Sequence, residues 1–181
     1  MAKVIFRYGI IAGLIVAIPW LIYLPTVPAD AKVQDMGGYV MGYAIILVAL
    51  SMVFLGIKHY RDKALGGVIR FGRGFVIGLG ISTIASVLYV VGWEIASSMS
   101  DFNFAQAWAA SMVEEARAKG ADAAGIARAT AEAAEFQRMY ANPMVRMPMV
   151  FSEIFPVGIL VSLISAAVLR NSRILPARIS A

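Results

Sequence analysis

Two acidic residues near the ends of apolar segments are the best candidates for chemistry in this sequence. Glu153 lies inside the fourth apolar segment, three residues before Pro156, and Glu94 follows Trp93 at the end of the third. A charge inside such a segment is costly unless it is paired or hydrated, so an ionisable residue there is a candidate for function. Proline lacks a backbone N–H, so Pro156 frees a carbonyl one turn earlier. Together these groups could bind a proton or a cation.

A structural role for both acids is the simpler interpretation. Glu153 lies only about 9 Å along a helix from the expected start of its segment, at 1.5 Å per residue. Its side chain could therefore reach the membrane surface or hydrogen-bond a neighbouring helix, and Glu94 could face water at the same level. We favour this interpretation, and the sequence leaves the proton or cation site open.

Other kinds of active site find no support in the sequence. The chain has no cysteine, which excludes disulfides and thiolate chemistry, and its single histidine, His59, cannot form a histidine metal cluster. The glycines around position 74, at Gly72, Gly74, Gly78 and Gly80, match neither nucleotide-binding glycine motif. We therefore expect no catalytic, cofactor-binding or metal-binding residues, and we expect that the protein is not an enzyme.

Four apolar segments predict the fold class. They span residues 4–24, 39–57, 71–93 and 147–169, in a 181-residue chain with 60% hydrophobic residues and a mean hydropathy of +0.77. About 20 apolar residues in a helix cross the roughly 30 Å hydrocarbon layer. We predict an all-α polytopic membrane protein with four transmembrane helices, forming a single membrane domain over residues 1–181. The first segment also resembles a secretory signal, but its length favours an uncleaved helix.

The basic residues predict the orientation. Ten of the 16 lysines and arginines lie in the N-terminal end, the second connection and the C-terminal tail. Cytoplasmic flanks are enriched in these residues, so we expect both termini to be cytoplasmic. The second connection also suggests contacts with anionic phospholipid, about 1 kcal/mol per basic residue. Its candidate residues are Lys58, Arg61, Lys63, Arg70 and Arg73.

The long connection 94–146 predicts an extracytoplasmic helical hairpin. Its first helix is expected over 104–119, ending at Gly120, and Asp122 is expected to cap a second helix that Asn142-Pro143 ends. Apolar residues recur at helical spacing along the second helix, at Ile126, Ala129, Ala133, Phe136 and Tyr140. This stripe packs against the first helix or lies on the membrane surface. The hairpin is a solvated spacer or a docking surface, and the sequence favours the spacer.

Small residues spaced four apart predict how the helices pack. Such a row leaves a groove on one helix face, and close backbone approach through grooves favours helix association in lipid. A compact four-helix bundle follows. The expected packing positions are Gly9, Gly13, Gly38, Gly42, Gly74, Gly78, Ser82, Gly158 and Ser162.

Two stretches resemble a known bacterial membrane family, domain of unknown function 4199. They are HYRDKALGGVIRFGRGFVIGLGIS and FSEIFPVGILVSLISAAVLR, and the long helical connection between them ends in YANP. The most specific elements are Gly66, Gly67, Ile69, Phe71 and Gly72 in the first stretch and residues 153–158 in the second. The resemblance implies a four-helix protein of the bacterial inner membrane. It implies no activity and supplies no catalytic residues.

Three functions are compatible with these features. We rank first a non-catalytic scaffold or regulatory component that acts through its extracytoplasmic hairpin. The alternative is a small oligomeric transporter or channel that uses Glu153, and a lipid-modifying enzyme ranks third because no reactive residue pair is visible. The expected partners are the bilayer, anionic phospholipid, and a membrane protein or further copies of the chain. Nucleic acid is not expected.

Overall fold

The computed structural model describes residues 1–33 and 36–176, without the side chains of 36–41, and over these residues it contains helices and no strands. After α1 (Ala2–Tyr23), a short 3-10 helix, η1 (Leu24–Thr26), leads to the connection before α2 (Met36–Ala64). α3 (Phe71–Ser98) is followed by the hairpin helices α4 (Phe104–Ala118) and α5 (Ala123–Ala141), and α6 (Pro143–Leu169) is the last.

Four helices are long and apolar enough to cross a membrane, as predicted. These candidate spans are Ala2–Thr26, Gly42–Ala64, Phe71–Ser98 and Pro143–Leu169. All four helices extend beyond the predicted apolar segments at one end or both, and α3 continues past Trp93 to Ser98. α2 continues past Ile57 to Ala64, and α6 begins at Pro143 instead of near Met147. The apolar pattern ends earlier than the helices because lysine, arginine and aspartate at a helix end lower the hydropathy without breaking the backbone hydrogen bonds.

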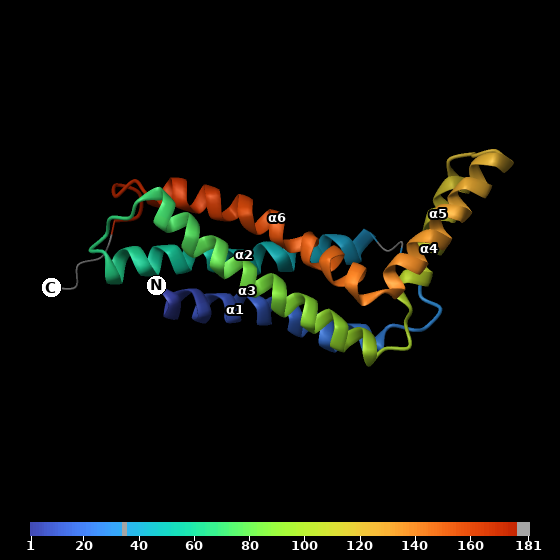
Figure 1. Ribbon diagram of the computed structural model, residues 1–181, viewed down its shortest axis with the longest axis horizontal. Coiled ribbons are helices and arrows are strands. Elements are labelled where there is room, and N and C mark those ends of the chain that lie inside the picture. The colour runs from blue at the N-terminus through green and yellow to red at the C-terminus, as the bar shows by residue number, and fades with distance from the viewer. Residues whose placement is uncertain (34–35, 177–181) are drawn as a thin grey trace.

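The four long helices form a bundle from which the α4–α5 hairpin projects at one end (Figure 1). The start of α1, the connection between α2 and α3, and the end of α6 lie at the opposite end. We call the end with the α4–α5 hairpin the hairpin end, and the opposite end the basic end. α2 and α3 each pack against the other three long helices, and the contacts of α3 with α1 and α6 are the most extensive.

Glycines allow α3 to approach α1 and α6 closely. A Cβ on Gly13 would fall 2.5 Å from Leu88 of α3, and one on Gly9 would fall 2.7 Å from Ile84. On the other side of α3, glycine and serine alternate across the contact with α6. The facing pairs are Gly74 and Ala166, Gly78 and Ser162, and Ser82 and Gly158. Ser82 and Ser162 are fully buried with their hydroxyls 3.3 Å apart, so the predicted groove is confirmed for α1, α3 and α6.

The packing prediction was wrong at Gly42 of α2. Among the described residues, no atom of another element lies within 4 Å of a Cβ built on Gly42, so this glycine makes no close contact with a described helix. Gly38 falls among residues 36–41, whose surroundings lie outside the described part. The close approach on α2 occurs at Gly56, where a Cβ would fall 2.5 Å from Ile81 and 3.1 Å from Tyr8. The four-residue spacing missed Gly56 because the residues four before and four after it, Met52 and Tyr60, are large.

The hairpin forms as its local sequence predicts. The Asp122 carboxylate accepts a hydrogen bond from the Gly125 N–H at 2.8 Å, which caps α5, and Gly120 has a φ of +73°. The apolar stripe of α5 packs against α4, with Ala133 and Tyr140 buried. Asn142 ends α5 and also caps α6, since its side chain accepts from the Met144 N–H at 3.0 Å. No loop therefore separates the hairpin from α6.

Candidate functional site

At the hairpin end, tyrosine and tryptophan side chains from α3 meet polar groups of α5 and α6. The Tyr89 hydroxyl donates to Oε2 of Glu153 at 2.8 Å. One turn further along α3, the Trp93 indole N–H donates to the Tyr140 hydroxyl at 2.9 Å. Tyr89, Trp93 and Tyr140 are buried. Burial raises the pKa of Tyr140 above its ordinary value, so its hydroxyl stays neutral under physiological conditions.

Glu94 forms a two-point ion pair with Arg146. The guanidinium donates from Nε to Oε1 at 2.7 Å and from Nη2 to Oε2 at 2.5 Å. Its Nη1 donates to the carbonyl of Tyr140 at 3.2 Å. The side chains of Arg146 and Glu94 are 21% and 22% exposed. One arginine thus joins the end of α3, the last turn of α5 and the start of α6.

Aromatic rings continue this junction into the hairpin. Trp93 lies edge-on to Trp20 of α1 and to Phe104 of α4, with ring centroids 5.2 and 5.3 Å apart. Phe104 also contacts Tyr140 at 5.5 Å, and Tyr140 contacts Phe136 at the same distance. Edge-to-face and tilted pairs at these distances are favourable. The hairpin is therefore fixed to the bundle by packing as well as by the ion pair.

The structure assigns separate partners to the predicted acids. Glu153 is exposed at the surface of α6 while its carboxylate turns to Tyr89. It hydrogen-bonds a neighbouring helix, in agreement with the structural interpretation, and it does not lie inside the bundle. Pro156 is exposed, and α6 continues through it. The sequence did not reveal Tyr89 and Arg146 as partners of the acids, because they lie 64 and 52 residues from Glu153 and Glu94 and follow no local spacing. It placed Tyr140 in the apolar stripe of the hairpin but not beside Trp93.

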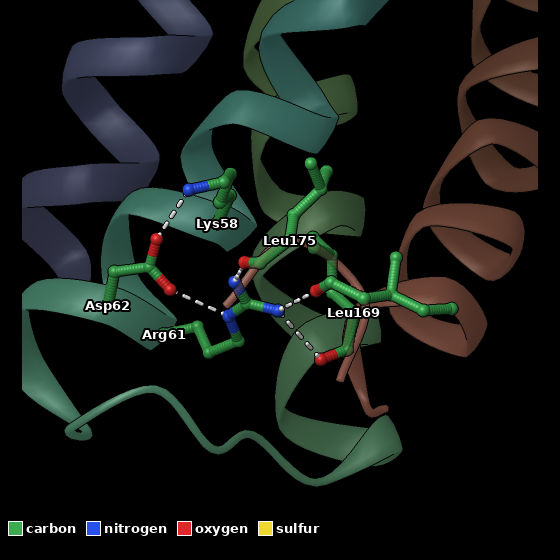
Figure 2. Close-up of polar contacts among 6 residues, drawn as sticks. Lys58, Arg61, Asp62, Leu169 and Leu175 are labelled. Atoms are coloured by element: carbon green, nitrogen blue, oxygen red, sulfur yellow. Dashed lines mark hydrogen bonds and ion pairs between the residues drawn. The ribbon is translucent and has the colours of Figure 1, made fainter. Parts of the chain in front are cut away.

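A second polar cluster lies at the basic end, around Arg61 (Figure 2). The Arg61 side chain is fully buried and donates from Nε to Asp62 Oδ1 at 2.7 Å. Its Nη1 donates to the carbonyls of Leu169 at 3.5 Å and Ile174 at 3.1 Å, and Nη2 donates to the carbonyl of Leu175. Arg61 therefore binds the last carbonyl of α6 and the turn that follows it.

Arg61 is not available to a lipid head group, so its predicted lipid contact was wrong. Lys58 is half-buried and pairs with the other oxygen of Asp62 at 2.6 Å. The remaining candidates, Lys63, Arg70 and Arg73, are exposed. The sequence could not distinguish the buried basic residues from the exposed ones. An arginine near the end of an apolar helix has the same local sequence pattern whether its side chain turns inward or outward.

The chain matches the family model described as "Protein of unknown function (DUF4199)" over residues 7–171. It belongs to this family. No curated protein and no solved structure matches the chain. The expected family is confirmed, and its description assigns no activity.

The two elements that carried the family resemblance lie at opposite ends of the bundle. Gly66 and Gly67 form the tight turn between α2 and α3, with φ of +62° and +94°, a region that favours glycine. Glu153 begins the second element and accepts from Tyr89. Within the described residues, no group of three or more histidine, cysteine or acidic residues is placed to hold a metal ion. His59 packs beside the ring of Tyr8, with centroids 5.7 Å apart.

Proposed function

We propose that this family member is a non-catalytic scaffold or regulatory component of the bacterial inner membrane that acts through the α4–α5 hairpin. In this proposal both termini are cytoplasmic and the hairpin lies outside. The observation that carries it is the attachment of the hairpin. The Glu94–Arg146 pair and the aromatic contacts of Trp93 hold it against the bundle, so the hairpin can transmit a load or a displacement from a partner to the spans.

The outward face of α5 supplies the surface for such a partner. Its exposed charged side chains carry both signs, at Arg128, Glu132, Glu135 and Arg138. The apolar stripe on the opposite face is already covered by α4. The proposed contact is therefore polar and belongs to a second membrane-associated protein with complementary charges.

Site-specific photocrosslinking in cells tests this proposal. A photoreactive phenylalanine analogue at Glu132 should give a discrete protein adduct, and the same group at the exposed Leu160 of α6 should not. Reversing the neighbouring charges with Arg128→Glu and Arg138→Glu should weaken the Glu132 adduct. Absence of an adduct at Glu132, or the same adduct at both positions, would contradict a hairpin-mediated function.

The proposed orientation has its own test, which uses the absence of cysteine. A membrane-impermeant maleimide added to spheroplasts should label Ala121→Cys in the hairpin and leave Ala64→Cys unlabelled, because the basic flanks favour the cytoplasm. Labelling of Ala64→Cys without labelling of Ala121→Cys would contradict the proposed orientation and indicate the opposite one.

A small oligomeric transporter or channel that uses Glu153 is the second candidate. It is favoured by buried serines that gather where α3 meets α6, because hydroxyls in such a contact could support a polar path. They are Ser82, Ser86, Ser162 and Ser165, and the Ser86 hydroxyl has no hydrogen-bond partner among the described residues. Against it, Glu153 already accepts from Tyr89. Ion flux in reconstituted vesicles that Glu153→Gln abolishes would favour this candidate over the scaffold.

A further inference from the structure

The basic end of the bundle carries an almost uncompensated positive charge. Of the described residues there, nine are lysine or arginine and one is acidic, Asp62. Both oxygens of Asp62 are taken, one by Arg61 and one by Lys58. This end therefore has no free carboxylate among its described residues to neutralise the other basic side chains. Those that remain exposed are Lys3, Arg7, Lys63, Arg70, Arg73, Arg170 and Arg173.

Helix packing places three of these arginines at the adjoining ends of α3 and α6. α3 and α6 run antiparallel, with Gly78 facing Ser162 and Gly74 facing Ala166. The same register places Arg70, which precedes α3, at the level of Arg170, which follows α6. Arg73 lies in the first turn of α3.

The buried Arg61 fixes the turn that carries Arg173. Its guanidinium binds the carbonyls on either side, at Leu169 and at Ile174 and Leu175 (Figure 2). Arg173 is exposed within this turn, and its backbone N–H donates to the side-chain oxygen of Asn171 at 3.0 Å. The internal arginine thus holds the turn against α2 while its exposed neighbours remain free for a ligand.

We propose that Arg70, Arg73, Arg170 and Arg173, with Lys63 beside them, form a surface that binds anionic phospholipid head groups. Four of the five lie at the ends of helices long enough to span a bilayer, and Arg173 lies in the turn just beyond α6. This is the level at which head groups meet a membrane protein. Arginine forks bind phosphate oxygens through two N–H groups. Each basic residue near an anionic surface contributes about fivefold in binding. The surface lies at the opposite end from the hairpin, so this inference is independent of the proposed function.

The test compares lipid retention and thermal stability of the purified full-length protein in detergent. Phosphatidylglycerol and phosphatidylcholine are added at equal mole fractions, and bound lipid is counted by native mass spectrometry. We expect preferential retention of phosphatidylglycerol and a higher Tm with this lipid than with phosphatidylcholine. The preference should fall at 1 M salt, where the Debye length shrinks from about 10 Å at 0.1 M to about 3 Å.

A charge-matched pair of variants locates the site. The first replaces the four arginines of the proposed surface, as Arg70→Gln, Arg73→Gln, Arg170→Gln and Arg173→Gln. The second replaces four exposed basic residues of the hairpin, as Arg117→Gln, Lys119→Gln, Arg128→Gln and Arg138→Gln. We expect the first variant to lose the preference for phosphatidylglycerol and the second to keep it.

Three outcomes would overturn the proposal. They are equal retention of the two lipids by the parent, equal loss in both variants, or reproduction of the Tm rise by inorganic phosphate alone. Should the first variant fold poorly, the pair Arg70→Gln and Arg173→Gln serves instead, and its Tm in phosphatidylcholine reports on folding separately from lipid preference. A retained preference in that folded pair would also contradict the site.

Discussion

Arg61 and Arg146 each tie helix ends together, but they do so at opposite ends of the bundle and with different partners. Arg61 is fully buried and binds three backbone carbonyls besides Asp62. Arg146 is about one-fifth exposed and pairs mainly with the carboxylate of Glu94. One arginine therefore satisfies backbone carbonyls from a fully buried position, and the other is held mainly by a carboxylate near the surface.

The difference shows that burial and partner type decide how much an ion pair stabilises a fold. Removing one partner of a buried pair leaves charge and polar groups without solvation, which is strongly destabilising. A partly exposed pair loses much less, because water replaces the missing partner. We therefore expect the basic end to be more sensitive than the hairpin end.

The largest effect is expected from Arg61→Met. It leaves Asp62 with Lys58 alone and deprives the carbonyls of Leu169, Ile174 and Leu175 of their donor, a loss of about 3–5 kcal/mol in unfolding free energy. Denaturation in mixed micelles measures it. The matched control is Lys63→Met, which removes the same charge two residues away at an exposed position. Equal destabilisation by the two variants would break the comparison.

Gly78→Leu tests how much the close packing of α3 against α6 contributes to stability, compared with the Arg61 contacts. A Cβ at Gly78 would fall 2.7 Å from Ser162 and 3.1 Å from Val53, so we expect a loss of about 1–3 kcal/mol from overpacking. Gly42→Leu is the control, because that position has open space. If Tm falls equally in both, the α3–α6 groove does not hold the bundle together.

Arg146→Gln should cost about 1 kcal/mol, less than Arg61→Met, because its pair with Glu94 reaches solvent. A double-mutant cycle with Glu94→Gln measures the coupling. Arg138→Gln, exposed in the last turn of α5, controls for charge. We also expect faster proteolysis of the hairpin in Arg146→Gln. A coupling as large as the Arg61 effect would show that partial exposure does not weaken the hairpin junction.

The smallest effect is expected at the exposed pair of Glu115 and Lys119. The Lys119 ammonium, 2.5 Å away, holds the pKa of the Glu115 carboxyl below its usual range. A carboxyl whose pKa is lower in the folded than in the unfolded state stabilises the folded protein at pH values above its unfolded-state pKa. This contribution is lost as the pH falls through the folded-state pKa. Glu115→Gln should therefore differ slightly from the parent in Tm at neutral pH and match it in acid. A difference that grows on acidification would contradict this pairing.

Local patterns predicted the hairpin and the spans well. Gly120, Asp122 and Asn142 end or cap helices where expected, because these conformations depend on the few residues nearest to them. The apolar segments gave four spans but ended α2 too early, at Ile57 instead of Ala64. Hydropathy indicates which residues can lie in lipid, but it does not mark where a helix ends. The backbone hydrogen bonds of α2 continue beyond its last apolar residues.

The candidate site was predicted only in part. Glu94 and Glu153 were visible as acids at the ends of apolar segments, but not their partners. Arg146 follows Glu94 by 52 residues and Glu153 follows Tyr89 by 64. No periodic pattern links residues so far apart, so these pairs could not be predicted from spacing.

The sequence by itself determined that four apolar helices are long enough to cross a membrane, that small residues permit close packing, and where the hairpin turns. These properties follow from segment length, side-chain size and local backbone preference. Only the tertiary structure decided that Arg61 turns inward while Arg70 and Arg73 stay exposed, and that Gly56 rather than Gly42 receives a neighbour. The rotation of each helix about its axis sets these outcomes, and that rotation is fixed by contacts with the other helices.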